Sequence, residues 1–318
     1  MQSIQTCFNF DLSKVKPLEE VLKYRTFCLE AVRQSCRGGT IRRNHSPVSG
    51  ARLLSWGTVD GLEYGICPKT GSLFLTEIPA PAAWASLLDK VNRYRNEQAF
   101  DVHLKQSRLT SVYEPKKAWI EDTLRWHHLE RPKVLEVTTP PSELTALLQT
   151  SPLVEEVVVW NETNPRPEGL WPEAADAAIL LESLDRSGDP AAFLKRVHES
   201  LKPGGLLFLT ALLASGFDMK VLGTKNLYLC PPDRTNCFSL NGLTQLLAQS
   251  GFTFIEVSTP GILDVEIVRA HCLQDPSIRL SPFETTLLDA DPEKLSALQI
   301  FLQQSNVSSF ARVVAKKN

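Results

Sequence analysis

The chain has 318 residues, of which 43% are hydrophobic and 22% are charged, and its formal net charge is −2. These values predict a globular protein of one to three domains, and they exclude a general attraction to nucleic acid or to an acidic membrane. No apolar run reaches the ~18–20 residues of a membrane span, and the N-terminus lacks a signal-peptide pattern. Seven widely spaced cysteines favour reduced thiols in a cytoplasmic protein over a disulfide framework.

Residues 1–110 are predicted to form a small α+β unit. It begins with an amphipathic helix from about residue 16 to residue 33. Three short strands are expected next, at 51–56, 62–67 and 72–75. Asp60-Gly61 is typical of a two-residue hairpin turn between the first two of them. The rest of the unit is predicted to contain a helix over 82–100 and then a linker that starts at residue 101 and runs to 113.

Residues 111–318 are predicted to form a second unit, in which buried strands alternate with helices. Short aliphatic runs bounded by charges and glycine are typical of a parallel sheet that is covered on both faces. The strands are expected at 133–137, 156–160, 176–182, 206–210 and 253–258, with a last, antiparallel strand at 309–316. The helices are expected at 115–128, 143–149, 190–201, 240–249, 282–288 and 292–304.

Three features of this second unit, in this order, resemble the class I S-adenosylmethionine-dependent methyltransferases. They are the acidic Glu136 near the end of the first strand, Asp176 opening a later strand, and the turn Leu201-Lys-Pro-Gly-Gly205. The resemblance covers about residues 110–318 and implies a Rossmann-like three-layer α/β/α sheet. It also implies that Glu136, Asp176 and Glu162, the last near the end of the second strand, lie around S-adenosylmethionine.

The glycine-rich cofactor loop of that family is replaced in this chain. By register, Thr138, Pro140 and Ser142 stand at the three glycine positions. The adjacent prolines 140 and 141 lack N–H donors and fix φ near −65°, so a loop that needs positive φ cannot form there. Only 15 residues separate Asn161 from Asp176, which leaves no room for the family's third strand and a helix. The sheet is therefore expected to lack one edge strand.

Residues 67–81 resemble the second half of a zinc ribbon that precedes some of these methyltransferases. Cys36-Arg-Gly-Gly39 resembles the first knuckle of that ribbon. Each knuckle keeps one cysteine, whereas a structural zinc site needs four ligands. With Cys36, Cys67 and His45 as the available candidates, we expect no metal site, and hairpin packing is expected to hold this part together.

Residues 229–239 resemble a loop in methyltransferases from bacterial surface-polysaccharide gene neighbourhoods. The resemblance places Arg234 where those proteins carry a histidine that could act as a general base. A guanidinium cannot accept that proton, although it could bind a phosphate or a carboxylate. The alternative interpretation is that Arg234 is a solvated charge on a surface loop. Asp264 is a second candidate catalytic residue. The alternative interpretation is that it caps a helix or faces solvent.

Two functions are compatible with these patterns. The first is a non-catalytic methyltransferase-fold protein with lost or weakened S-adenosylmethionine binding, or with no cofactor at all. It would act as a binding or assembly partner, in a homo-oligomer or in a hetero-oligomer with an active paralogue. The second is an active methyltransferase on a sugar or another small hydroxylated acceptor, with Glu136, Glu162 and Asp176 still placed around the cofactor.

Overall fold

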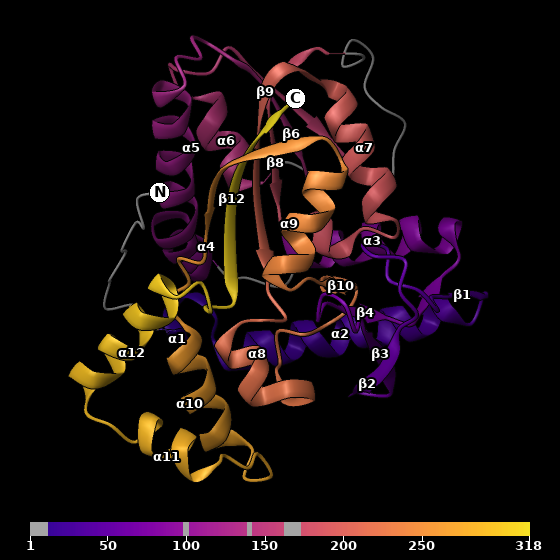
Figure 1. Ribbon diagram of the computed structural model, residues 1–318, viewed down its shortest axis with the longest axis vertical. Helices are drawn as coiled ribbons and strands as arrows, with labels where there is room; N and C mark the ends of the chain where they lie inside the picture. Colours follow the sequence, from indigo (N-terminus) through magenta and orange to yellow (C-terminus); the bar gives the residue numbers. More distant parts are fainter. Residues whose placement is uncertain (1–11, 98–101, 139–141, 162–172) are drawn as a thin grey trace.

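A six-stranded mixed sheet forms the centre of the molecule (Figure 1). The computed structural model describes residues 12–97, 102–138, 142–161 and 173–318. The strands lie in the order β11-β12-β9-β8-β6-β7, and the last four of these are mutually parallel. Their bounds are β6 Lys133–Val137, β7 Glu156–Trp160, β8 Ala175–Leu181, β9 Leu201–Leu212, β11 Phe252–Ser258 and β12 Phe310–Lys317. As predicted, the last strand is antiparallel, and it lies between β9 and β11.

Side chains of the sheet alternate between two apolar layers, because successive residues of a strand point to opposite faces. Val134, Ile179 and Phe208 pack in one layer with helices α5 (Glu114–Trp126) and α6 (Glu143–Gln149). The residues next to them in sequence, Leu135, Leu180 and Leu209, pack with α7 (Pro190–Ser200) and α9 (Leu240–Gln249). Figure 1 shows the two pairs of helices on either side of the sheet. The α/β/α architecture expected from the sequence is confirmed.

The outer edge of β7 is also the edge of the sheet in the described part of the chain. No described residue adds a strand beyond β7. The absence of one edge strand stays a prediction. The segment in question, residues 162–172, lies outside the described residues.

A smaller antiparallel sheet lies beside the main one, in the order β10-β4-β3-β2. Its strands are β2 Leu54–Val59, β3 Leu62–Ile66, β4 Leu73–Leu75 and β10 Asn236–Cys237. Asp60 and Gly61 both have positive φ, 47° and 81°, as the predicted two-residue hairpin turn requires. The sequence did not predict β10, which reaches this sheet from the second predicted unit. It also missed the pair formed by β1 (Thr40–Arg42) and β5 (Glu77–Pro79).

Two segments differ from the sequence-based expectations. The predicted linker 101–113 is largely helical, because α4 (Val102–Arg108) continues through a π-helical turn, η1 (Leu109–Tyr113), into α5. The predicted turn Leu201–Gly205 belongs to β9, whose first residue pairs with Ala175 of β8. A register shift after this pair absorbs the turn, and Gly204 supplies its left-handed residue, at φ 77°.

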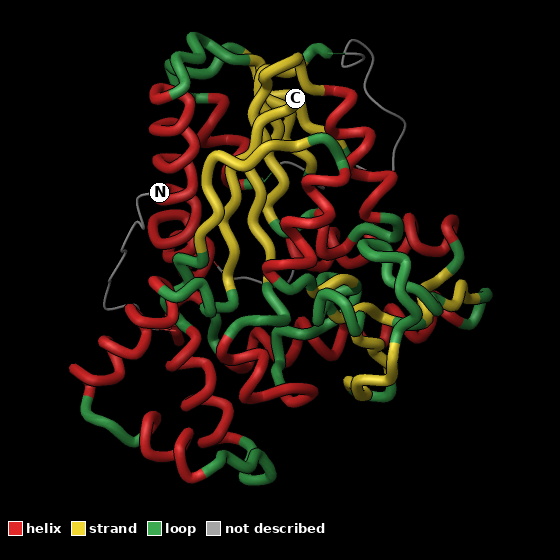
Figure 2. The backbone as a smooth tube through the Cα atoms, in the orientation of Figure 1, coloured by secondary structure: helices red, strands yellow, loops and turns green. Residues whose placement is uncertain are grey.

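Helices complete the molecule at two places. Helices α2 (Leu18–Cys36) and α3 (Pro81–Glu97) accompany the small sheet, whereas short helices share an apolar cluster below the main sheet in Figure 1. The latter are α1 Leu12–Val15, α8 Phe217–Leu222, α10 Asp264–Gln274, α11 Pro282–Leu288 and α12 Pro292–Gln304. Figure 2 shows that helix dominates this lower region. None of the helices in the described ranges has the length and apolarity needed to cross a bilayer.

Candidate functional site

The carboxyl ends of the parallel strands define the edge at which ligands of open α/β sheets bind. Glu136 lies one residue before the end of β6, and Glu182 directly follows β8. Glu182 has a φ of 60°, in the left-handed region that glutamate seldom adopts. Because such backbone strain often marks functional sites, this edge is where we place the candidate site.

Glu136 is held by the helix that follows it. Its side chain is buried, and its two carboxylate oxygens accept hydrogen bonds from the hydroxyls of Ser142, at 2.6 Å, and Thr145. Burial raises the pKa of Glu136, while these two hydroxyls oppose the shift. Ser142 is also the N-cap of α6, because its hydroxyl accepts from the backbone N–H of Thr145. The predicted helix start is therefore confirmed, and its cap residue binds the acidic residue.

The other predicted cofactor residues are not gathered around Glu136. Thr138 donates its backbone N–H to the carbonyl of Trp160, at 3.1 Å, which extends the contact between β6 and β7. Pro140 and Glu162 lie outside the described residues. Asp176 lies at the amino end of β8, the opposite edge of the sheet, where it accepts from the backbone N–H of Lys133, at 2.9 Å, and from the ammonium of Lys202, at 2.6 Å. We therefore leave Asp176 out of the site.

Arg234 lies at the candidate edge, and both terminal nitrogens of its guanidinium contact acidic side chains. Its guanidinium forms an ion pair with Glu182 and a second one, at 3.3 Å, with Asp185. Asp185 is itself completely buried and accepts the backbone N–H of Leu212, at the end of β9. Arg234 thus connects the ends of β8 and β9, which a solvated loop charge would not do.

The two carboxylates that contact Arg234 respond differently to burial. Burial opposes ionisation of Glu182, but the charges of Arg234 and Lys116 lower its pKa well below the ordinary value. For Asp185 burial dominates over the charge of Arg234, and the pKa rises to about 8. Glu182 is therefore the permanent anion of this cluster, whereas Asp185 exchanges a proton near neutral pH.

Asp185 should make the protein less stable as the pH rises. Its carboxyl keeps a proton up to about pH 8 in the folded state, whereas an unfolded aspartate loses it near pH ~3.9. The folded state then binds more protons between these two values, so the free energy of unfolding decreases with rising pH across that window. We expect the wild type to lose about 3–4 kcal/mol relative to Asp185→Asn between pH 5 and pH 8. Urea denaturation at both pH values measures this difference, and equal losses in the two proteins would contradict it.

Two lysines that the sequence analysis missed lie at the same edge. Lys16, which follows α1, places its ammonium 4.1 Å from the centre of the Tyr228 ring. Lys116, in the first turns of α5, lies 5.6 Å from the ring centre of Phe310 and 5.9 Å from that of Tyr113. In the sequence both look like ordinary lysines on a helical surface, so no local signal distinguishes them.

Asp264, the second predicted catalytic residue, is a buried structural anchor. It accepts hydrogen bonds from the backbone N–H of Ser309, at 2.6 Å, from the hydroxyl of Ser308, at 2.6 Å, and from the amide of Gln299, at 2.8 Å. These bonds tie the start of α10 to α12 and to the segment before β12. With its lone pairs occupied in this way, the Asp264 carboxylate is committed to the fold.

The cysteines of the two segments that resemble zinc knuckles belong to different parts of the core. Cys36 ends α2 and packs against the cluster under the small sheet, whereas Cys67 is buried in the cluster beneath the main sheet. The thiol of Cys67 lies 3.1 Å from the hydroxyl of Ser49. In the described ranges no three histidine, cysteine or acidic residues are grouped so that they could hold a metal ion.

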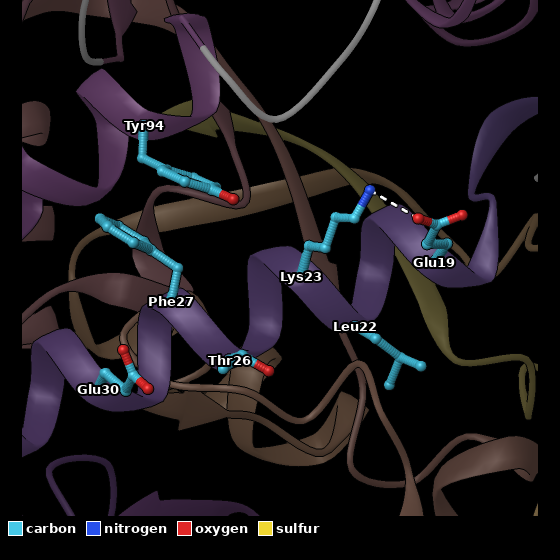
Figure 3. Close-up of a pocket in the computed structure, with 7 residues that line it drawn as sticks. All are labelled: Glu19, Leu22, Lys23, Thr26, Phe27, Glu30 and Tyr94. Atoms are coloured by element: carbon cyan, nitrogen blue, oxygen red, sulfur yellow. Dashed lines mark ion pairs between the residues drawn. The ribbon is translucent and has the colours of Figure 1, made fainter.

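A shallow groove of about 480 Å³ runs along helix α2 at a second place (Figure 3). Phe27 and Tyr94 stack face to face in it, with ring centres 3.9 Å apart. Lys23 points to Glu19 and forms an ion pair with it, at 2.7 Å. The groove is open, and its one lysine is paired with Glu19, so the edge of the main sheet remains the stronger candidate site.

Comparison with known proteins identifies the class to which this fold and site belong. Residues 49–257 match the family described as a methyltransferase domain, which is more than half of the chain. The chain therefore belongs to this methyltransferase family. No match was found among curated proteins.

Solved structures with a similar fold include the following two methyltransferases. One is the 1,6-didemethyltoxoflavin N1-methyltransferase of Burkholderia thailandensis with bound S-adenosylhomocysteine, at 13% identity over 83% of this chain and 99% of that one, with a TM-score of 0.42. The other is an S-adenosylmethionine-dependent methyltransferase from Thermotoga maritima, at 13% identity over 74% of this chain and 100% of that one, with a TM-score of 0.41. The assignment of this chain to the family rests on residues 49–257.

Proposed function

We propose that this chain is a degenerate member of the methyltransferase family in which S-adenosylmethionine binding is lost or weakened. It would act as a non-catalytic binding or assembly partner, in a homo-oligomer or beside an active paralogue, in the cytoplasm. The observation that carries this proposal is the double engagement of Ser142, at the third glycine position, as the cap of α6 and as a donor to Glu136.

Ser142 matters because of what a glycine-rich loop does for a ligand. In such loops, backbone N–H groups at the helix start are free to face the bound molecule. In this chain the hydroxyl of Ser142 accepts the N–H of Thr145, and the hydroxyl of Thr145 accepts the N–H of Ser142, at 2.9 Å. The first turn of α6 and the carboxylate of Glu136 are thus satisfied within the protein. This part of the loop does not fit the family's cofactor.

Arg234 supports the same proposal from the other side of the site. A general base must be able to take up a proton at working pH. The guanidinium cannot do so, and it is held by Glu182 and Asp185. The loop that could provide a base in related proteins instead provides a structural cation in this chain.

Isothermal titration with S-adenosylmethionine and S-adenosylhomocysteine tests the proposal. We expect no heat of binding for the wild type up to about 1 mM ligand. The dissociation constant would then exceed about 1 mM, which is too weak to hold the cofactor. An active family member in the same buffer is the positive control. A variant with Thr138→Gly, Pro140→Gly and Ser142→Gly should gain affinity, because it frees main-chain groups at the end of β6. Micromolar binding by the wild type would overturn the proposal.

An active methyltransferase on a sugar or another small hydroxylated acceptor is the second candidate. It is favoured by the charged cluster of Lys16, Lys116, Glu182 and Arg234 at the ligand-binding edge, which a scaffold alone does not require. Transfer of a labelled methyl group from S-adenosylmethionine to a set of sugars and sugar derivatives, measured beside the titration, distinguishes the two functions. Turnover would establish the second, whereas binding without turnover would leave a ligand-binding pseudoenzyme.

A further inference from the structure

The two lysines at the carboxyl edge have no carboxylate of their own. In the described part of the chain, the contacts found for the ammonium groups of Lys16 and Lys116 are with aromatic rings, and neither forms an ion pair. Glu182 is the carboxylate with the strongest influence on both, but its own ion pair is with Arg234. The edge therefore carries positive charge that the protein does not neutralise.

This charge is also partly withdrawn from solvent, because both lysine side chains are half-buried. Burial lowers the pKa of Lys16 to about 8, and it lowers the pKa of Lys116 as well. A buried charge costs free energy unless an opposite charge or a hydrogen-bond acceptor compensates it. An anion placed between or beside the ammonium groups would supply that compensation and would return both pKa values toward their ordinary range.

Segments far apart in the sequence converge on the lysines. Lys16 lies over the ring of Tyr228, in the segment after α8, and Lys116 lies near Phe310, at the start of β12. Tyr113, the last residue of the π-helical turn, is also near Lys116. π-helical turns inside longer helices are frequent at functional sites, because they shift the side chains that follow. All three rings are half-buried.

We propose that Lys16 and Lys116 bind the phosphate group of a small molecule at the carboxyl edge of the main sheet, with the rings of Tyr113, Tyr228 and Phe310 beside it. An ammonium is a compact point charge with three donors that can rotate, and it is a common phosphate ligand. A dianionic phosphate compensates both ammonium charges, whereas a carboxylate compensates only one. Arg234 is already occupied by two carboxylates. The near-neutral net charge of the chain favours a small ligand over a polyanion.

This inference goes beyond the proposed function, because the lysines lie at the end of β8 and the start of β12 and not at the end of β6. It holds whether or not S-adenosylmethionine binds. Failure of the cofactor titration and failure of the phosphate site are therefore separate results.

Sulfate is the probe of choice, because it stays dianionic across the pH range in which phosphate titrates. Titration of the full chain with sulfate at pH 7 and constant ionic strength should show saturable binding. Lys16→Gln and Lys116→Gln should each weaken it about tenfold, as expected for loss of one charge-assisted contact. Lys90→Gln is the matched control, because Lys90 also lies over an aromatic ring, Phe27, but on α3. It should bind like the wild type.

Three further arms separate a ligand site from a structural role. Lys16→Arg and Lys116→Arg should keep most of the affinity. Glu182→Gln should lower thermal stability but tighten sulfate binding, because it removes the carboxylate that competes for both ammonium groups. Acetate at the same concentration should bind at least about tenfold more weakly than sulfate.

The pH dependence gives a last check. The charges that face Lys16 are Glu182 after β8, Asp218 on α8, Arg108 on α4 and Arg234 in the loop. Glu182 and Arg234 keep their charge between pH 7 and pH 9, and burial raises the pKa of Asp218 to about 7. Sulfate affinity should therefore begin to fall near pH 7, as Asp218 loses its proton, and it should fall further above pH 8, as Lys16 loses its own. Absence of wild-type binding, or equal binding by wild type, Lys16→Gln and Lys116→Gln, would overturn the proposal, as would acetate binding as tightly as sulfate.

Discussion

Replacing Arg234 with methionine is expected to lower the free energy of unfolding by about 3–5 kcal/mol. Methionine fills similar volume, so packing is largely conserved and the effect is electrostatic. The change leaves the Glu182 carboxylate without its counterion, and it leaves the completely buried Asp185 carboxyl without its guanidinium partner. It also breaks the link between the ends of β8 and β9. Urea denaturation followed by circular dichroism at pH 7 measures the loss.

Two further variants test the cause of this loss. Arg234→Met combined with Glu182→Gln should recover part of the stability, because the carboxylate that stays ionised is then gone. Arg234→Lys should fall between wild type and Arg234→Met, since a single ammonium cannot contact both carboxylates as the fork does. If the double variant is no more stable than Arg234→Met, then the destabilisation does not come from unpaired charge.

Phe238→Ala is expected to cost about 3–5 kcal/mol and to destabilise both sheets together. Phe238 is completely buried and follows β10, and its ring meets that of Phe74 on β4 edge to face, with ring centres 5.9 Å apart. Both rings belong to the apolar cluster that contains α7 and α9. Because one cluster serves the two sheets, we expect a single unfolding transition, shifted to lower denaturant in the variant.

Near- and far-ultraviolet circular dichroism during denaturation should report the same midpoint for this variant. Phe283→Ala is the control, because its side chain is 71% exposed and should change the stability by less than about 0.5 kcal/mol. Two separated transitions would show that the small sheet unfolds on its own, which would contradict the shared core.

The local sequence predicted the main sheet well, because its signals are local. Helices such as Glu143–Gln149 and Leu240–Gln249 have the predicted bounds, since caps and apolar periodicity mark both ends. The small sheet was less predictable. Its strand β10 is two residues long, and it pairs with a segment more than 160 positions earlier in the chain. Periodicity in a short window cannot reveal such a partner.

The residues of the candidate site also differ in whether a local sequence signal marks them. Glu136 and Arg234 could be found from sequence, because each lies in a segment with a family resemblance. Lys16 and Lys116 could not, because their significance depends on the rings that tertiary structure places beside them. Asp176 and Asp264 show the converse case, because each is a candidate in the sequence and contacts fold-stabilising donors in the structure.

The late arrival of β10 also bears on biosynthesis. During translation the ribosome releases residues 54–75 long before residues 236–237. The edge of β4 is therefore at first without β10, the strand that pairs with it in the folded protein. Unpaired strand edges pair readily with other chains, and β4 (Leu73–Leu75) is short and apolar. The nascent protein therefore passes through a stage in which a chaperone would protect this edge from pairing with other chains. The stage ends when the Asn236–Cys237 segment pairs with β4.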